Sequence, residues 1–383
     1  MKAFNFFVPT QIRFGVGRLK ELKEFAPTYG QKCLLVSRPL NGSLKETYSE
    51  IIALLQAVNI EVYFFDEVVP NPTIEGVENG VSIAVKNKVD FVLGVGGGSV
   101  LDTAKLIAFL HNSETKIDWD KAISDYDNPF SISPSPKESL PFIAISTTSG
   151  TGSQCTQAAV VSDPKSKNKI TLFHAGLFPV ISIVDPELMC SVPSEVTAAT
   201  GFDAFTHAFE SFLGGRTSPM TEQMSLQAIQ LVLDNLPKAL ADLKNIEVRS
   251  NLAWADTLAG MCLANGGADL PHPLGEIIGG ICPRIAHGDT LAIVYPNFLN
   301  YKADKVPYKF IQIANHLNLK ANPGALVEAI LNLFKITGLS SALEKANLTQ
   351  QEIESIKGHP LLSQLQPENS DRIHQMMDES LNK

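Results

Sequence analysis

The chain has 383 residues, 44% hydrophobic and 19% charged, so it can form a sizeable core and is too long for a single ordinary one. It carries 31 basic and 40 acidic residues, a formal charge of -9, and no basic tract, which argues against binding to nucleic acid or to an anionic membrane. We expect a cytoplasmic enzyme, because the N-terminus lacks a signal-peptide pattern, no apolar run approaches a membrane span, and the five cysteines are scattered.

The first half of the chain alternates short apolar runs with segments of helical periodicity. Strands are predicted at 32–37, 60–65, 90–95, 141–146 and 180–185. A stretch rich in Ser, Pro and Asp at 124–140 is predicted to be a long surface loop. This alternation predicts an α/β domain with a mostly parallel sheet over residues 1–187.

A glycine-rich segment, GVGGGSVLDTAK at 94–105, joins a predicted strand to a predicted helix. Successive glycines can adopt unusual backbone angles, and the helix N-terminus is favourable for phosphate, so the segment indicates a phosphate-binding loop. Asp102 is a possible cap of the first helical turn. A tight turn without a ligand is the alternative. In an ordinary Rossmann unit an acidic residue about twenty positions after the loop holds the ribose, and here no acidic residue stands at the end of a strand at that spacing. A second Ser/Thr/Gly turn at 146–156 can close over the same ligand from the other side.

Beyond residue 187 the strand signal disappears and long helix-period segments follow, which predicts an all-α domain over residues 188–383. The first helix is expected to begin near Pro193. Ser194 is a possible N-cap; if Pro193 is itself the first helical residue, Val192 is a poor cap.

The helical half contains four possible metal ligands. Asp203 and His207 are four residues apart, hence on one face of a helix, and His272 and His287 follow in sequence. Any one of these histidines is more often a core residue, but one carboxylate with three imidazoles suits Fe²⁺, Zn²⁺, Mn²⁺ or Co²⁺. A nucleotide loop and a divalent cation together favour hydride transfer from an alcohol, because the cation lowers the pKa of the hydroxyl and a nicotinamide accepts the hydride.

Several motifs in order resemble the iron-containing alcohol dehydrogenases, relatives of glycerol dehydrogenase and dehydroquinate synthase. They are GGGSxxDxxK at 96–105, TTSGTGSQ at 147–154, DPEL at 185–188, GFDAFTHAFE at 201–210 and the later HPLG…HG segment. The resemblance implies an N-terminal dinucleotide domain, a dehydroquinate-synthase-like helical metal domain, and a homodimer or larger homo-oligomer.

The resemblance also implies roles for individual residues. The metal ligands would be Asp203, His207, His272 and His287. The cofactor would be bound by the pyrophosphate loop, the second loop and three further positions: Gly96, Gly97, Gly98 and Ser99; Thr147, Thr148 and Thr151; Asn71, Asp102 at the nicotinamide end, and Lys169.

Three positions depart from the family pattern. Arg38 stands where NAD-using members have an acidic residue for the ribose 2′-hydroxyl, and a guanidinium pairs with a 2′-phosphate, so NADP is favoured over NAD. Glu276 replaces a histidine found four residues after the third ligand in many members; we interpret it as a possible catalytic proton relay, with coordination of the cation or support of His272 as alternatives. Gln154 replaces a glutamate, which we interpret as a minor change.

The sequence therefore predicts an NAD(P)-dependent, Fe²⁺-dependent (alternatively Zn²⁺-dependent) alcohol dehydrogenase or aldehyde reductase. A maleylacetate-reductase-like or dehydroquinate-synthase-like enzyme is the alternative on the same scaffold. These act on anionic substrates, and only Arg284 flanks the predicted ligands. A metal-stabilised binding protein without enzymatic activity would leave both cofactor loops unexplained.

Overall fold

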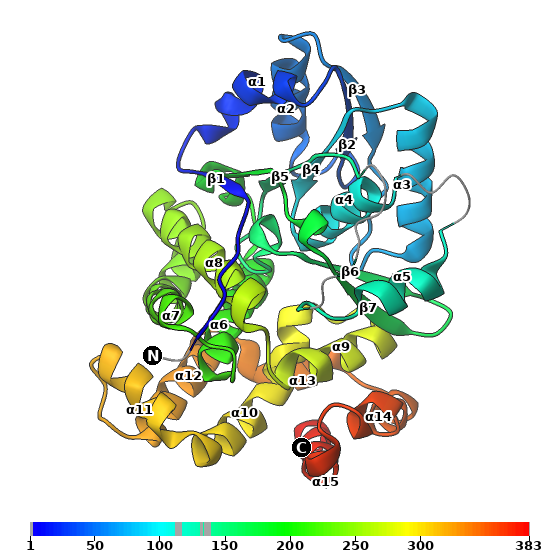
Figure 1. Cartoon of the computed structure of the whole chain (residues 1–383). Coiled ribbons are helices and arrows are strands. Elements are labelled where there is room, and N and C mark those ends of the chain that lie inside the picture. Colours follow the sequence, from blue (N-terminus) through cyan, green and yellow to red (C-terminus); the bar gives the residue numbers. More distant parts are fainter. Residues whose placement is uncertain (1–2, 112–116, 131–132, 134–138, 383) are drawn as a thin grey trace.

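The computed structural model describes residues 3–111, 117–130, 133 and 139–382. Its first half contains a sheet flanked by helices, and its second half consists of packed helices below that sheet (Figure 1). The last strand ends at Val184 and the first long helix of the second half begins at Ser194. The division into domains at residue 187 remains a prediction.

The main sheet has six strands, all parallel, in the order β1-β8-β5-β4-β2-β3. The predicted α/β fold with a mostly parallel sheet is confirmed, and all five predicted strands are present. The strands are β1 (Gln11–Phe14), β2 (Lys32–Val36), β3 (Glu61–Phe65), β4 (Phe91–Gly96), β5 (Phe142–Ser146), β6 (Ala158–Asp163), β7 (Asn168–Phe173) and β8 (Ile181–Val184).

Alternate side chains of the parallel strands face two separate cores. In β2, Leu34 and Val36 pack with the helices on one face, whereas Cys33 and Leu35 pack with those on the other. The first face is covered by α3 (Ile74–Asn87) and α4 (Gly98–Leu110), and the second by α1 (Leu22–Phe25) and α2 (Lys45–Gln56). Burial on both faces explains why these strands read as continuous apolar runs rather than alternating ones.

The topology opens a crevice at the carboxyl ends of β2 and β4, which are neighbours in the sheet. From β2 the chain passes through α2 to β3 on one side, and from β4 it passes through α4 to β5 on the other. The two connections cover opposite faces, so the crevice lies at a topological switch point, where ligands bind in open α/β sheets.

The second half is helical throughout the described residues, as predicted, and has its own apolar core. Its helices are α6 (Ser194–Leu213), α7 (Pro219–Ala241), α8 (Ile246–Gly266), α9 (Pro271–Ile281), α10 (His287–Lys305), α11 (Pro307–His316), α12 (Pro323–Thr337), α13 (Ala342–Ala346), α14 (Gln350–Lys357) and α15 (Ser370–Leu381). Helix α6 begins next to Pro193, as predicted, but both predictions for its cap are wrong: Pro193 is itself the N-cap, in an extended conformation, and no side chain caps the helix.

Two features of the first half differ from the prediction. Residues 124–126 belong to helix α5 (Trp119–Tyr126), with Tyr126 buried, rather than to a surface loop; 131–132 and 134–138 lie outside the described residues. Strands β6 and β7 form an antiparallel hairpin that was not predicted. This hairpin packs through β7 against α9 and so carries residues of the first half towards the helical half (Figure 1).

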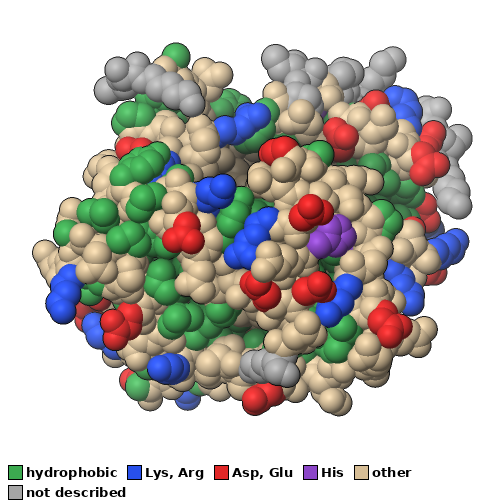
Figure 2. All heavy atoms as spheres, turned by 90° about the horizontal axis from the view of Figure 1, so that it is seen from below, with side chains coloured by type: hydrophobic (Ala, Val, Ile, Leu, Met, Phe, Trp, Pro, Cys, Tyr) green, Lys and Arg blue, Asp and Glu red, His purple; other side chains and the backbone are tan. Residues whose placement is uncertain are grey.

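Acidic and basic side chains are interspersed on the face seen from below, with apolar side chains between them (Figure 2). Within the described part of the chain, no single helix is long and apolar enough to cross a membrane. Helix α12 and the segment 339–346 reach that length and composition only together, and they meet at an angle of 84°.

Candidate functional site

The glycine-rich segment forms the turn from β4 into α4, as predicted, but for a different physical reason. None of Gly96, Gly97 and Gly98 has a positive φ. A Cβ on Gly97 would lie 3.0 Å from Thr148 Oγ1, and one on Gly98 would lie 2.5 Å from Thr151 Cγ2. The glycines are therefore needed because another loop approaches closely, and the same lack of side chains leaves the N-terminus of α4 open to an anion.

The approaching loop is the second predicted cofactor loop. It leaves β5 directly beside the first loop, since Ser146 pairs with Gly96 in the sheet and Thr147 N–H donates to the Gly96 carbonyl at 3.0 Å. The structure thus places Thr148 and Thr151 next to the glycines, in the loop that follows the neighbouring strand.

Asp102 does not cap α4, because the N-cap is Gly97 and Asp102 lies a turn further along the helix. Its partly buried carboxylate accepts hydrogen bonds from Ser153 Oγ at 2.7 Å and from Val160 N–H at 3.0 Å. Burial raises the pKa of Asp102, and Lys105 and these hydrogen bonds act against that rise. Asp102 also lines the cleft between the two halves, so it joins the helix to the second loop and to β6.

The four predicted metal ligands converge in that cleft. Asp203 Oδ1 lies 3.6 Å from His207 Nε2, 3.7 Å from His272 Nε2 and 3.8 Å from His287 Nε2. Two ligands on one small divalent cation are about 3 to 3.5 Å apart when each lies about 2.1 Å from it. The spacings from Asp203 Oδ1 are a few tenths of an ångström wider. The ligand atoms of Asp203, His207 and His272 all lie within 4.8 Å of one another, so a small contraction would bring these three to one ion, and His287 Nε2 would have to move closer to the other two imidazoles to join them.

Unpaired buried atoms show that this set fits a cation. Asp203 Oδ1 and His272 Nε2 are fully buried and have no hydrogen-bond partner among the described residues. Such atoms destabilise a fold unless a ligand or ion satisfies them. The nitrogen and oxygen donors suit iron or zinc, and no cysteine thiol joins the cluster.

In His207 and His272, the ring nitrogen that faces away from Asp203, Nδ1, makes a hydrogen bond with the protein. His272 Nδ1 donates to Glu210 Oε2 at 2.8 Å, and His207 Nδ1 donates to the Gly150 carbonyl at 3.2 Å. These bonds fix the tautomers that leave Nε2 free to coordinate. Burial lowers the pKa of His207, whereas for His272 the carboxylates of Glu210 and Asp203 outweigh burial and raise the pKa.

Asp256, on α8, holds the second cofactor loop to the helical half. Its oxygens accept from Gly152 N–H and from Gln154 Nε2, each at 2.8 Å. Gly152 has a φ of 61° and packs against Gly260, where a Cβ would lie 2.4 Å from the Gly260 Cα. Since the Gly150 carbonyl of this loop supports His207, Asp256 links the cofactor loop to the metal ligands. Gln154, predicted to be a minor change, is therefore part of this contact.

The cleft has a volume of about 260 Å³ and is lined from both halves. Asn71, Lys169 and Glu276 line it together with the ligands. Asn71 donates through Nδ2 to the Pro283 carbonyl at 2.9 Å, so it also bridges the halves. Glu276 accepts from Thr171 Oγ1 at 3.4 Å; burial raises the pKa of Glu276, and the charge of Lys169 opposes that rise.

Arg38 lies outside this cleft. It is exposed and follows β2, whose end is beside that of β4 at the switch point. It is therefore on the correct edge of the sheet for the ribose end of a dinucleotide that extends from the glycine loop.

Three buried groups at the site were not found from the sequence: Lys105, Glu210 and Asp256. Lys105 Nζ donates to the carbonyl oxygens of Thr156 and Ala158, at 3.0 and 2.7 Å. Glu210 and Lys105 stand in quoted motifs, so their chemistry could have drawn attention. Asp256 had no such signal in the sequence.

Two family models match this chain, one over its N-terminal half and one over its C-terminal half. The model described as iron-containing alcohol dehydrogenase matches residues 9–186, and the one described as Fe-containing alcohol dehydrogenase family, C-terminal, matches residues 197–380.

Individual proteins give the same result. The chain is 34% identical to the long-chain-alcohol dehydrogenase 1 of Geobacillus thermodenitrificans, over 86% of this chain and 81% of that protein. It is 29% identical to the NADPH-dependent butanol dehydrogenase of Clostridium saccharobutylicum, over 92% and 89%. The crystal structure of an NADH-dependent butanol dehydrogenase A from Thermotoga maritima superposes with a TM-score of 0.85 at 27% identity, over 100% of this chain and 99% of that one.

Proposed function

The chain belongs to the iron-containing alcohol dehydrogenase family, and we propose that it interconverts an uncharged alcohol and its aldehyde with NADP(H) and Fe²⁺ in the cleft. It is a metal-dependent oxidoreductase that transfers a hydride between a nicotinamide cofactor and an alcohol or aldehyde. The choice of NADP and of iron, the substrate and the residue roles are the proposal.

The observation that carries the proposal is the convergence of Asp203, His207, His272 and His287 within the cleft that the glycine loop borders. A bound Fe²⁺ would supply Lewis-acid polarisation of the substrate oxygen, and Zn²⁺ would suit the same donors. The chain's part is to present one carboxylate oxygen and three imidazole nitrogens to the cation.

Gly96 to Ser99 and Thr147 to Thr151 would hold the dinucleotide, with the pyrophosphate at the start of α4. Asn71, Asp102 and Lys169 line the cleft beyond these loops, where the nicotinamide would lie. Arg38 supports the choice of NADP, because a guanidinium binds a 2′-phosphate through paired hydrogen bonds. The relatives include both NADPH-dependent and NADH-dependent enzymes, so the cofactor must be measured.

Glu276 is the proposed proton relay. Its carboxylate lines the cleft beside Lys169 and Thr171, and the pKa raised by burial brings it towards the value that a base needs near neutral pH. In alcohol oxidation, Glu276 would accept the hydroxyl proton; in aldehyde reduction, it would return it.

The charges near the cleft favour an uncharged substrate over the anionic substrates of the alternative enzymes. Arg284, the one basic residue flanking the ligands in sequence, is paired with Glu352 through two hydrogen bonds of 2.6 and 2.9 Å. Lys169 faces the charge of Glu276. We also infer that the protein is cytoplasmic, because all five cysteines are free thiols. We infer a homo-oligomer from the resemblance to the family.

The test is a panel of aldehydes and alcohols assayed with NADPH and NADH on protein reconstituted with Fe²⁺, with Zn²⁺ or without metal. We expect NADPH-dependent reduction of uncharged aldehydes that requires the metal. Bound metal without any aldehyde-dependent oxidation of either cofactor would support a binding protein instead.

A further inference from the structure

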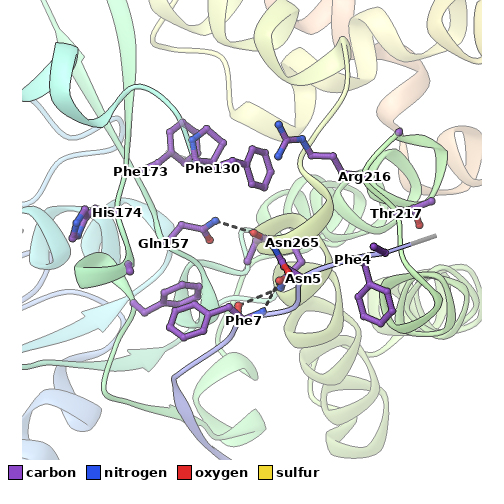
Figure 3. Close-up of a pocket in the computed structure, with 16 residues that line it drawn as sticks. Phe4, Asn5, Phe7, Phe130, Gln157, Phe173, His174, Arg216, Thr217 and Asn265 are labelled. Atoms are coloured by element: carbon purple, nitrogen blue, oxygen red, sulfur yellow. Dashed lines mark hydrogen bonds between the residues drawn. The ribbon is translucent and has the colours of Figure 1, made fainter. Parts of the chain in front are cut away.

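A second, larger cavity of about 590 Å³ adjoins the cleft. Figure 3 shows that its walls come from segments far apart in the sequence: the N-terminal segment, the end of β7, the segment after α5 and the connection between α6 and α7. The N-terminal segment is tied to the far wall, since Phe7 N–H donates to Asn265 Oδ1 at 2.7 Å. The cavity is thus formed by the native fold rather than by a single loop.

The cavity and the cleft share part of their lining. Pro129, Gln157, Phe173 and Ala264 line both spaces, so a molecule bound near the metal ligands can extend past them. At this junction Gln157 is 8% exposed; its Nε2 donates to the Ala264 carbonyl at 2.8 Å, while its Oε1 has no partner among the described residues. A buried amide oxygen of this kind is stabilised when a ligand or water donates to it.

Aromatic rings are prominent in the walls, alongside polar side chains such as Asn5, Thr217 and Asn265. Five phenylalanines line the cavity, and three of them are substantially exposed: Phe4, Phe7 and Phe130, with Phe173 and Phe178 behind them. Exposed rings gathered around one cavity are typical of a binding site, because each is stabilised when a ligand covers it.

The charged groups exclude an ionic ligand. Among the described residues that line the cavity none is acidic, and Arg216 is already stacked on the Phe130 ring at 3.4 Å, so a cationic ligand would meet repulsion at a ring already covered. Both ring nitrogens of His174 already have protein partners, since Nδ1 accepts from Gly176 N–H and Nε2 donates to the Ser133 carbonyl. An anion would find one exposed guanidinium, that of Arg216, beside the uncharged side chains of Asn5, Thr217 and Asn265 and the phenyl rings.

We propose that this cavity binds the remote end of the substrate, and that this end is a neutral aryl group on a short stem. The inference rests on the proposed function. The hydroxyl or aldehyde would lie at the four metal ligands, the stem would pass Gln157 and Ala264, and the ring would pack among the phenylalanines.

The test compares kcat/KM of the metal-loaded enzyme for propan-1-ol, hexan-1-ol, 3-phenylpropan-1-ol, 4-hydroxybutanoate and choline, with the cofactor that gives the higher turnover. We expect 3-phenylpropan-1-ol to exceed propan-1-ol by about tenfold or more, hexan-1-ol to fall between them, and both ionic alcohols to remain at or below propan-1-ol. A preference for hexan-1-ol or for an ionic alcohol would overturn the inference.

Phe130→Ala should lower the ratio of kcat/KM for 3-phenylpropan-1-ol over propan-1-ol by about threefold or more. Phe64→Ala is the matched control, because Phe64 and Phe130 are both 39% exposed and Phe64 lies on β3, away from the cavity. An unchanged ratio in Phe130→Ala would contradict the inference while leaving the proposed function intact.

If no alcohol is oxidised, the proposed function fails, and calorimetric binding of the same alcohols to the metal-loaded protein still tests the cavity. Tighter binding of 3-phenylpropan-1-ol than of propan-1-ol, reduced in Phe130→Ala, would support it. Equal binding would overturn it.

Discussion

Glu210 accepts a hydrogen bond from Nδ1 of His272 at 2.8 Å, while Nε2 of the same ring faces Asp203 Oδ1 at 3.7 Å. The His272 ring therefore contacts the Glu210 carboxylate through one nitrogen and faces the proposed cation site through the other. The side chains of Glu210 and Asp203 are both buried. Glu210 Oε2 also accepts from Asp269 N–H at 2.7 Å, so the carboxylate is fixed and holds the His272 ring in one orientation.

We expect Glu210→Gln to weaken metal binding by about 10- to 100-fold, because such supporting carboxylates orient the ring and make it a better donor. Competition with a chromophoric chelator measures the affinity. Glu247→Gln, on the exposed start of α8, is the control and should not change it. An equal affinity in Glu210→Gln would mean that the carboxylate supports only the fold.

Arg38→Ala should lower kcat/KM for NADPH by about tenfold or more and leave NADH nearly unchanged, because only the 2′-phosphate loses charged hydrogen bonds. Arg38→Lys keeps the positive charge but loses the paired N–H donors of the guanidinium. Its kcat/KM for NADPH should lie between those of wild type and Arg38→Ala. Steady-state kinetics with both cofactors decide the question. A wild-type preference for NADH would contradict the role given to Arg38.

Glu276→Gln should reduce kcat and remove one ionisation from its pH profile, because the amide keeps the size of the side chain but cannot accept the proton. The matched control is Thr171→Val, which removes the hydroxyl 3.4 Å from Glu276 Oε1 and keeps the carboxylate. An unaltered profile in Glu276→Gln would leave coordination or support of His272 as its role.

Asp256 predicts a pH dependence of stability. Burial raises the pKa of Asp256 from 3.8 to about 7, so between these values the folded state binds a proton that the unfolded state has lost. Its contribution to the free energy of unfolding is therefore present below about pH 4 and is lost as the pH rises through 7.

Asp256→Asn should remove the loss of stability at high pH, because an amide does not titrate. Gln154 can turn its unpaired Oε1 towards the new amide. The Tm of the variant relative to wild type should accordingly be higher at pH 8 than at pH 5. Asp234→Asn on the exposed side of α7 should show no such trend. A difference in Tm that does not vary with pH would contradict the raised pKa.

The sequence was sufficient for features that depend on local periodicity or on residue type. Apolar runs such as those of β4 and β5 predicted the sheet, because burial on both faces requires them. Asp203 and His207 could be grouped because a helix places them together, and His272 and His287 joined them through their chemistry.

Features that depend on tertiary contacts were missed or misinterpreted. Asp102 was expected at a helix end, but its partners, Ser153 and Val160, lie some fifty residues away. Glycine is likewise required at positions 97 and 98 because the neighbouring loop leaves no room for a side chain, and not because of unusual backbone angles. The β6–β7 hairpin escaped prediction because its strands are only partly buried and mix polar residues with apolar ones, so they form no continuous apolar run.

Four side chains from α6, α9 and α10 are proposed to share one cation. Anomalous diffraction at the iron edge, on crystals of protein loaded with Fe²⁺, tests it directly. We predict a single strong peak about 2.0 to 2.2 Å from Asp203 Oδ1 and from Nε2 of His207, His272 and His287. A peak bound elsewhere, or iron retained with these four groups turned away from it, would contradict the account.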